Sequence, residues 1–174
     1  MRVNYDFEEV VLSNVQNCIG QDFQLKELFE NDKPYLISFL RHFGCIACSE
    51  HITEIIAIKS QFREIGVHLV FVGNGKFKEL DSFIERMQLI DDNITIVTDS
   101  SLEIFEKFGL EYSILSLINV GTLTSAMRAF KKGHRNKGTK GGEAGSHLQQ
   151  GGIALLDSFH DLQYYFRSEY LGDK

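Results

Sequence analysis

Several residue types are scarce in this sequence, and each scarcity argues against a class of protein. The 174 residues include three cysteines, one proline and no tryptophan. Three cysteines are too few for the disulfide framework of a small secreted domain. No apolar run reaches the roughly 18 residues that a membrane-spanning helix requires, and the first residues, MRVNYDFEEVV, lack the basic and apolar segments of a secretory signal. We therefore expect a cytoplasmic protein without a membrane span.

Positive charge is also in short supply. The formal net charge is −6, whereas a general nucleic-acid binder needs a basic surface, so we expect no nucleic-acid partner. One segment departs from this balance and carries Arg128, Lys131, Lys132, Arg135, Lys137 and Lys140. It runs into a glycine-rich stretch, residues 131–147, that is typical of a flexible, solvated loop. Binding of a carboxylate lipid, a phosphate or a nucleic acid is the alternative for this local cluster.

The pattern of apolar residues indicates one α/β domain. Hydrophobic residues make up 43% of the chain, enough for a full core over residues 1–174. Periodicity predicts strands at 8–14, 34–43, 67–75, 93–99, 151–157 and 162–168, and helices at 22–31, 45–66, 77–89 and 100–109. This order implies a largely parallel sheet with helices on its faces, ending in an antiparallel hairpin. Residues 110–150 break the pattern, and we expect an insertion that is partly helical and partly flexible.

The segment RHFGCIACSEH, from Arg41 to His51, carries the most chemistry. A buried strand is predicted before it and an amphipathic helix after it, so Cys45 lies at the helix N-terminus and Cys48 in its first turn. Unpaired N–H groups and the helix dipole favour a thiolate there. The three-residue spacing brings the two sulfurs within bonding reach, so Cys48 can resolve a mixed disulfide or sulfenic acid on Cys45.

The same segment can also be written H-x-x-C-x-x-C-x-x-H, which resembles a set of zinc ligands. Zinc needs four ligands that converge, usually with a second pair from a distant segment. His42 would lie on the strand and His51 on the helix, and the sequence has no second C-x-x-C and no H-x-x-x-H motif. We therefore favour a redox pair with no metal and no other cofactor, with an inert structural pair as a further alternative.

Other residues are candidates for supporting this pair. Arg41 and His42 flank it and can stabilise a thiolate, or can point to solvent. Arg128 can orient an anionic substrate or stabilise the thiolate, or can be a solvated residue on a helix. Arg167 has the same two interpretations, His51 is expected to be a neighbour of the site, and Cys18 is expected to be an idle thiol.

Four landmarks in this order resemble the peroxiredoxin-like 2 family: RHFGCIACSEH, AMRAF (126–130), QQGGIALLD (149–157) and RSEYLGD (167–173). That family belongs to the AhpC/TSA branch of the thioredoxin-like fold and includes prostamide/prostaglandin F synthase. The resemblance runs from about residue 10 to the end. It implies a central mixed sheet flanked by helices, with a long insertion before the last hairpin. Thioredoxin-like domains usually end in one more helix, but the residues YLGDK after the hairpin leave no room for it, so we expect no obvious final helix.

The resemblance also implies an activity. Cys45 and Cys48 would be the redox pair of a thiol-dependent reductase that acts on a peroxide or a lipid endoperoxide and is recharged by thioredoxin or another thiol donor. Without a final helix, one sheet face would be covered by the insertion or by a second copy in a homodimer. The alternatives are a redox-inactive binding or regulatory module of the same fold and, second, a zinc-binding protein.

Two departures from the resemblance bear on the substrate. Typical peroxiredoxins carry T-x-x-C, and either alignment of the pair places Cys45 or His42 where that threonine would stand. Thioredoxins carry a cis-proline before the strand that faces the active site, where this chain has Gly151 or Gly152. We expect Gly152 to open the approach to the sulfurs.

Overall fold

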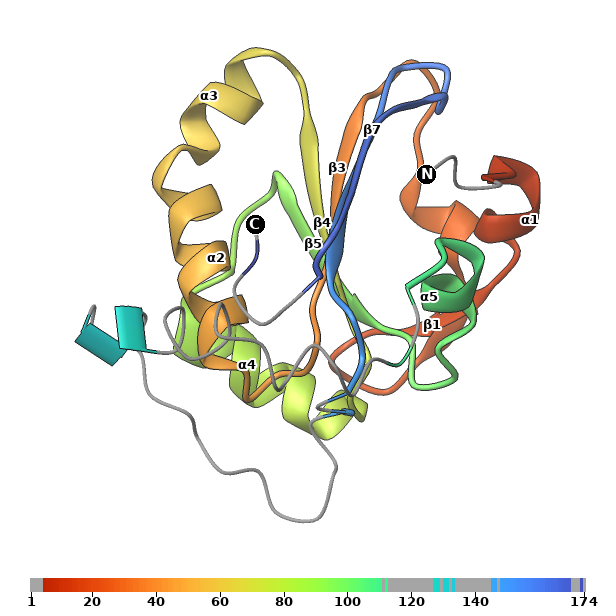
Figure 1. The fold of residues 1–174 in the computed structure, drawn as a ribbon. Coiled ribbons are helices and arrows are strands. Elements are labelled where there is room, and N and C mark those ends of the chain that lie inside the picture. Colours follow the sequence, from red (N-terminus) through yellow and green to blue (C-terminus); the bar gives the residue numbers. More distant parts are fainter. Residues whose placement is uncertain are drawn as a thin grey trace.

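The computed structural model is an α/β fold with helices on both faces of one sheet (Figure 1). It describes residues 5–110, 112, 127–128, 130–131, 133, 145–146, 148–169 and 173. Over these residues the strands form a seven-stranded mixed sheet in the order β2-β1-β5-β4-β3-β6-β7. None of the described helices is both long and apolar enough to cross a membrane.

The parallel part of the sheet is confined to its centre, where β3 pairs with β4 and β4 with β5. All other strand pairs are antiparallel. The strands are β1 Asn14–Gln16, β2 Asp22–Gln24, β3 Tyr35–Phe39, β4 His68–Gly73, β5 Ile94–Thr98, β6 Gly152–Leu156 and β7 Leu162–Arg167. The expectation of a largely parallel sheet is therefore wrong outside the three central strands, whereas the closing hairpin is confirmed.

The helices form two layers. They are α1 Phe7–Val11, the 3₁₀ helix η1 Leu25–Leu28, α2 Ile46–Ala57, α3 Lys59–Glu64, α4 Phe77–Met87 and α5 Glu103–Lys107. In Figure 1, α2, α3 and α4 lie on one side of the sheet, and α1 and α5 lie on the other. Each layer covers its own apolar cluster, because alternate residues of a strand point to opposite faces. Strand β3 thus sends Tyr35, Ile37 and Phe39 to the α5 side and Leu36 to the α2 side.

Two expectations for the N-terminal segment are wrong. Residues 8–14 were expected as a strand because of the pair Val10 and Val11, yet residues 7–11 are helical. Asp6 caps this helix by accepting from the Glu9 N–H at 3.4 Å, and both valines are buried in it. Residues 22–31 form β2 and one 3₁₀ turn rather than a helix, because β2 pairs with β1.

The expected long helix after Cys45 is interrupted at Ile58. Helix α2 ends at Ala57 and α3 begins at Lys59, with Ile58 at φ −115° and ψ 17°. The chain then turns at Gly66, whose φ of +74° is the left-handed conformation that glycine adopts without strain. The predicted stop of the helix at this glycine is confirmed.

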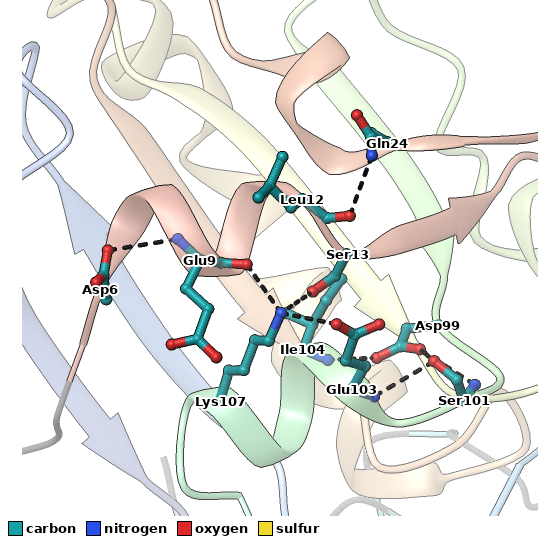
Figure 2. A network of polar contacts seen from close by, with 10 residues as sticks. All are labelled: Asp6, Glu9, Leu12, Ser13, Gln24, Asp99, Ser101, Glu103, Ile104 and Lys107. Carbon is teal, nitrogen blue, oxygen red and sulfur yellow. Dashed lines mark hydrogen bonds and ion pairs between the residues drawn. The ribbon is translucent and has the colours of Figure 1, made fainter.

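A network of polar contacts joins α1, β1 and α5 on the face away from α2 (Figure 2). The Lys107 ammonium donates to the Glu9 carbonyl at 2.8 Å, the Ser13 hydroxyl at 2.9 Å and the Glu103 carboxylate at 2.7 Å. We call these four residues the Lys107 network. Beside it, the Asp99 carboxylate accepts from the Ile104 N–H at 2.8 Å, although the N-cap of α5 is Leu102.

Most of residues 110–150 lie outside the described residues, and the expectations of a flexible insertion and of a basic loop at 131–147 fall there. The described residues 127, 128, 130 and 131 are helical, and the partly helical, partly flexible insertion stays a prediction. The residues after Glu169, apart from Asp173, also lie outside the described ranges.

Candidate active site

Both cysteines lie where the strand-to-helix junction was expected to place them. Strand β3 ends at Phe39, and Cys45 is the N-cap of α2, with extended backbone (φ −71°, ψ 122°). Its sulfur accepts a hydrogen bond from the Cys48 N–H at 3.4 Å, so it uses one of the donors that a helix start leaves unpaired. Both thiols are reduced, and Cys45 is 2% and Cys48 8% exposed.

The loop that leads into the pair is held by two neighbouring elements. The Asn74 side chain, just after β4, donates to the Arg41 carbonyl at 2.7 Å. The Arg86 guanidinium of α4 donates to the Phe43 carbonyl at 2.6 Å. The Phe43 ring packs so closely on Gly73 that a β-carbon there would lie 2.2 Å from it. The backbone around the sulfurs is therefore fixed from the β4 and α4 sides.

The surroundings of the pair shift the pKa values of its two thiols in opposite directions and favour the thiolate on Cys45. A hydrogen bond from the Cys48 thiol is the largest influence and lowers the pKa of Cys45 from 9.0 to about 7, against the opposing effect of burial. The Arg41 charge and the Ala47 N–H act in the same direction. The same contact with Cys45, followed by burial, raises the pKa of Cys48 well above 9.0. Cys45 therefore ionises before Cys48, and it does so near neutral pH.

A pocket adjoins this pair on the Cys48 side. Its lining includes Arg41, Cys48, His51, Gly152, Phe166 and Asp173, but not Cys45. These residues come from the loop after β3, from α2, from the hairpin β6–β7 and from near the C-terminus. The volume is about 40 Å³, and since one water needs roughly 10–15 Å³, a few waters or a peroxide group fit.

Gly151, just before β6, and Gly152, its first residue, are required by the packing around them. A β-carbon on Gly151 would lie 2.8 Å from the Phe39 carbonyl oxygen, and one on Gly152 would lie 2.6 Å from the Phe166 carbonyl oxygen. Close approach of neighbouring backbone therefore explains both glycines. Gly152 does line the pocket, and its effect on access to the sulfurs stays a prediction.

The structure brings some candidate residues to the pair and leaves others away from it. Arg41 and His42 are both buried, at 3% and 6% exposure, so neither points to solvent. Arg167 donates to the Gly109 carbonyl at 3.4 Å. Cys18, in the turn between β1 and β2, is partly buried against the apolar cluster on the α2 side. Ser168 and Asp173 line the pocket and were missed, since no local pattern in the sequence marks the end of a chain as part of a site.

Arg128 reaches the site region through an ion pair that the sequence did not suggest. Its Nε lies 3.2 Å and its Nη2 also 3.2 Å from oxygens of the Glu50 carboxylate, two residues beyond Cys48. The Glu50 side chain is 1% exposed and that of Arg128 is 43% exposed. The only feature of the sequence that could have pointed to Glu50 is that an acidic residue stands close to the start of a buried helix.

Within the described parts of the chain, no three His, Cys, Asp or Glu side chains converge as ligands for a metal ion. His42 and His51 therefore do not complete a tetrahedral set with the two sulfurs. The even spacing of the motif produces a zinc pattern in the sequence but no zinc geometry in the fold.

Comparison with known protein families shows to which family the chain belongs. Residues 54–170 match the AhpC/TSA antioxidant enzyme family. The match covers more than half of the chain, and the protein belongs to this family. It begins after Cys45 and Cys48, so any role for the two sulfurs rests on the geometry described above.

The relatives are more specific, and they confirm the resemblance to the peroxiredoxin-like 2 family. Peroxiredoxin-like 2C of Mus musculus is 26% identical over 88% of this chain and 69% of its own length. Prostamide/prostaglandin F synthase of Sus scrofa is 25% identical over 84% and 73%. The chloroplastic thioredoxin-like protein AAED1 of Arabidopsis thaliana is 23% identical over 86% of this chain, which spans only 60% of that protein.

Solved structures confirm the thioredoxin-like fold with its mixed central sheet. Peroxidoxin BcpB from Mycobacterium tuberculosis superposes with a TM-score of 0.64 at 13% identity, over 92% of this chain and 84% of that one. The bacterioferritin comigratory protein of Xanthomonas campestris gives 0.66 at 10% identity, over 96% and 86%. At such identities the likeness concerns the fold alone.

Proposed function

We propose that this protein is a thiol-dependent oxidoreductase that reduces a peroxide with the Cys45–Cys48 pair. The observation that carries the proposal is the position of Cys45 at the start of α2, where its sulfur accepts from the Cys48 N–H, with Cys48 lining a pocket of peroxide size. A thiolate is the nucleophilic form of cysteine, and a second thiol in contact with it can close a disulfide. Membership of a family of antioxidant enzymes supports the same chemistry.

In this proposal one sulfur attacks the peroxide and the other resolves the sulfenic acid that forms. The sequence favoured Cys45 as the attacking sulfur, and the lowered pKa of Cys45 supports that order. Access supports the reverse order, because Cys48 lines the pocket and Cys45 does not. We take access as decisive, since a proton moves readily between two sulfurs that are already hydrogen-bonded. Cys48 gives its proton to Cys45, attacks the O–O bond, and is then resolved by Cys45.

The surroundings of the pocket support an organic peroxide as substrate. Strand register pairs Ile153 with Phe166 and Leu155 with Tyr164, so these four side chains share the α2 side of the hairpin. Ile153 and Phe166 line the pocket, and Tyr164 beyond them is 54% exposed. An apolar group on the peroxide would bury this surface and gain roughly 25 cal/mol per Å². A lipid hydroperoxide or endoperoxide is therefore favoured, with a thioredoxin-type dithiol as the donor.

The test is a count of free thiols in quenched samples before and after one equivalent of cumene hydroperoxide. The variants are Cys45→Ser and Cys48→Ser, and Cys18→Ser is the matched control. We expect the wild type and the control to lose two thiols together through an intramolecular disulfide. Cys45→Ser should stop at a sulfenic acid on Cys48 that dimedone traps, and Cys48→Ser should react far more slowly.

Other outcomes have defined meanings. Thiols that stay unchanged under peroxide and disulfide stress would contradict the proposal and favour a binding or regulatory module. A sulfenic acid that forms faster on Cys45 than on Cys48 would reverse the order of attack but keep the pair. Covering of the hairpin by a second copy is a separate proposal, and a monomeric mass in solution scattering would count against it.

A further inference from the structure

His51 lies in the same pocket as Cys48 and has no role in the chemistry described so far. The two residues are three positions apart on α2, a spacing that places side chains on the same side of a helix. Both line the pocket. His51 is half-buried, so its imidazole can meet a molecule bound there while keeping contact with solvent protons.

Peroxide reduction at this site needs a proton at a second position. When a thiolate attacks the terminal oxygen of a hydroperoxide, the O–O bond breaks and the other oxygen leaves as an alkoxide. An alkoxide is strongly basic, so a donor within hydrogen-bonding reach lowers the barrier substantially. The Cys48 proton cannot serve, because it has already passed to Cys45.

The other polar groups of the pocket are poor donors of a proton. Arg41 remains charged at all ordinary pH values and can only stabilise negative charge. The Asp173 carboxylate is an acceptor when ionised, and the Ser168 hydroxyl is a very weak acid. Imidazole is the side chain that exchanges its proton in the neutral range. His51 is thus the group in the pocket suited to general acid catalysis.

We infer that His51 is a catalytic residue that donates the proton to the leaving oxygen of the peroxide. This inference rests on the proposed function. The Cys48 thiolate takes the terminal OH of the hydroperoxide and becomes a sulfenic acid, and the imidazolium of His51 protonates the departing oxygen to give an alcohol. The Cys45 thiol then attacks the Cys48 sulfur, forming the disulfide and releasing water. A donor dithiol returns two electrons and two protons to the pair.

Charged groups around His51 act in both directions. Arg41, from the loop after β3, and Asp173, near the C-terminus, line the same pocket as His51 and carry opposite charges. On α2 itself the neighbours are Glu50, paired with Arg128, and Glu54, one turn further on. The imidazole therefore has both a cation and carboxylates nearby.

The experiment compares two kinds of oxidant in single turnovers of the reduced protein, with His51→Asn and the wild type in parallel. Cumene hydroperoxide releases an alkoxide that needs a proton, and peracetic acid releases acetate, which does not. We expect His51→Asn to lose about 100-fold or more with cumene hydroperoxide, within the range of general acid catalysis. With peracetic acid we expect a loss below about threefold. For the wild type, the cumene hydroperoxide rate should also fall on the alkaline side, and this limb should be absent in the variant.

A matched control is His160→Asn, at the turn of the hairpin β6–β7, where the imidazole contacts the Glu30 carbonyl at 3.2 Å. It should leave the ratio of the two oxidant rates unchanged, and circular dichroism confirms that both variants fold. Equal losses with both oxidants in His51→Asn, or no loss, would overturn the inference. If the wild type reacts with neither oxidant, the proposed function itself fails.

Discussion

Two polar regions of this molecule, the Lys107 network and the β3–α2 junction, contain similar hydrogen bonds but differ in burial. In the Lys107 network, one ammonium joins three oxygens at 2.7 to 2.9 Å on the outer side of α1 and α5 (Figure 2). Its Lys107 and Glu103 side chains are 18% and 46% exposed. At the β3–α2 junction, by contrast, every residue from 41 to 50 is buried.

The two regions differ in how their hydrogen bonds affect the pKa values of the groups they join. The Lys107 ammonium lowers the pKa of the Glu103 carboxyl, which is already ionised at neutral pH, so no group changes its charge there. At the junction one hydrogen bond between sulfurs moves the pKa of Cys45 into the neutral range and that of Cys48 away from it. The proposed reactivity of the pair rests on this difference, since a hydrogen bond shielded from water shifts pKa values more than an exposed one.

We expect the largest effect, a change in the pKa of Cys45, from removing the Cys48 thiol. Cys48→Ala deletes the main cause of the lowered Cys45 pKa, which should move from about 7 back toward 9.0. At pH 7 such a shift lowers the thiolate fraction about 50-fold. The measurement is a pH titration of thiolate absorbance near 240 nm, with Cys18→Ser in both proteins as background. An unchanged titration would show that the helix start alone sets the Cys45 pKa.

The next effect is a dependence of stability on pH. The pKa of Cys45 is lowered in the folded protein, from 9.0 to about 7, so its contribution is fully present above pH 9 and is lost as the pH falls through 7. Between pH 7 and 9 the free energy of unfolding of the reduced protein should rise by about 2 kcal/mol. The raised pKa of Cys48 acts with the opposite sign above pH 9. Urea unfolding across this range measures the rise, and Cys45→Ser should flatten it.

A smaller effect concerns the ion pair beside the junction. In a double-mutant cycle, Glu50→Gln and Arg128→Met should couple by about 1 to 2 kcal/mol, because the Glu50 carboxylate is buried and accepts two bonds from Arg128. Thermal or urea unfolding of the four proteins gives the coupling. If the losses of stability in the two single variants simply add up in the double variant, the pair contributes no more than an exposed surface contact.

The smallest effect tests the other region. Lys107→Met removes three bonds of the Lys107 network and should cost about 1 kcal/mol, as expected for partly exposed pairs. The Glu103 pKa should return toward its ordinary value, and the thiolate titration of Cys45 should stay where it is. A shifted titration would contradict the separation of the two regions.

Local pattern and tertiary contact contributed differently to the prediction of the fold. The central strands and the helices at 77–89 and 100–109 were predictable, since their apolar periodicity agrees with their burial. The segment Phe7–Val11 was not, because Asp6 capping and burial outweigh the strand preference of two valines. The site divides in the same way: Cys45 and Cys48 followed from a junction, whereas Asp173 and the pairing of Glu50 with Arg128 needed the folded chain.

The sequence by itself determined the pair of sulfurs and its position at a helix start, because spacing and periodicity are local properties of the chain. It also contained the resemblance that the family comparison confirmed. Only the tertiary structure decided which sulfur faces the pocket and which residues share that pocket. These features depend on contacts between segments more than a hundred residues apart, and no local pattern encodes such distances.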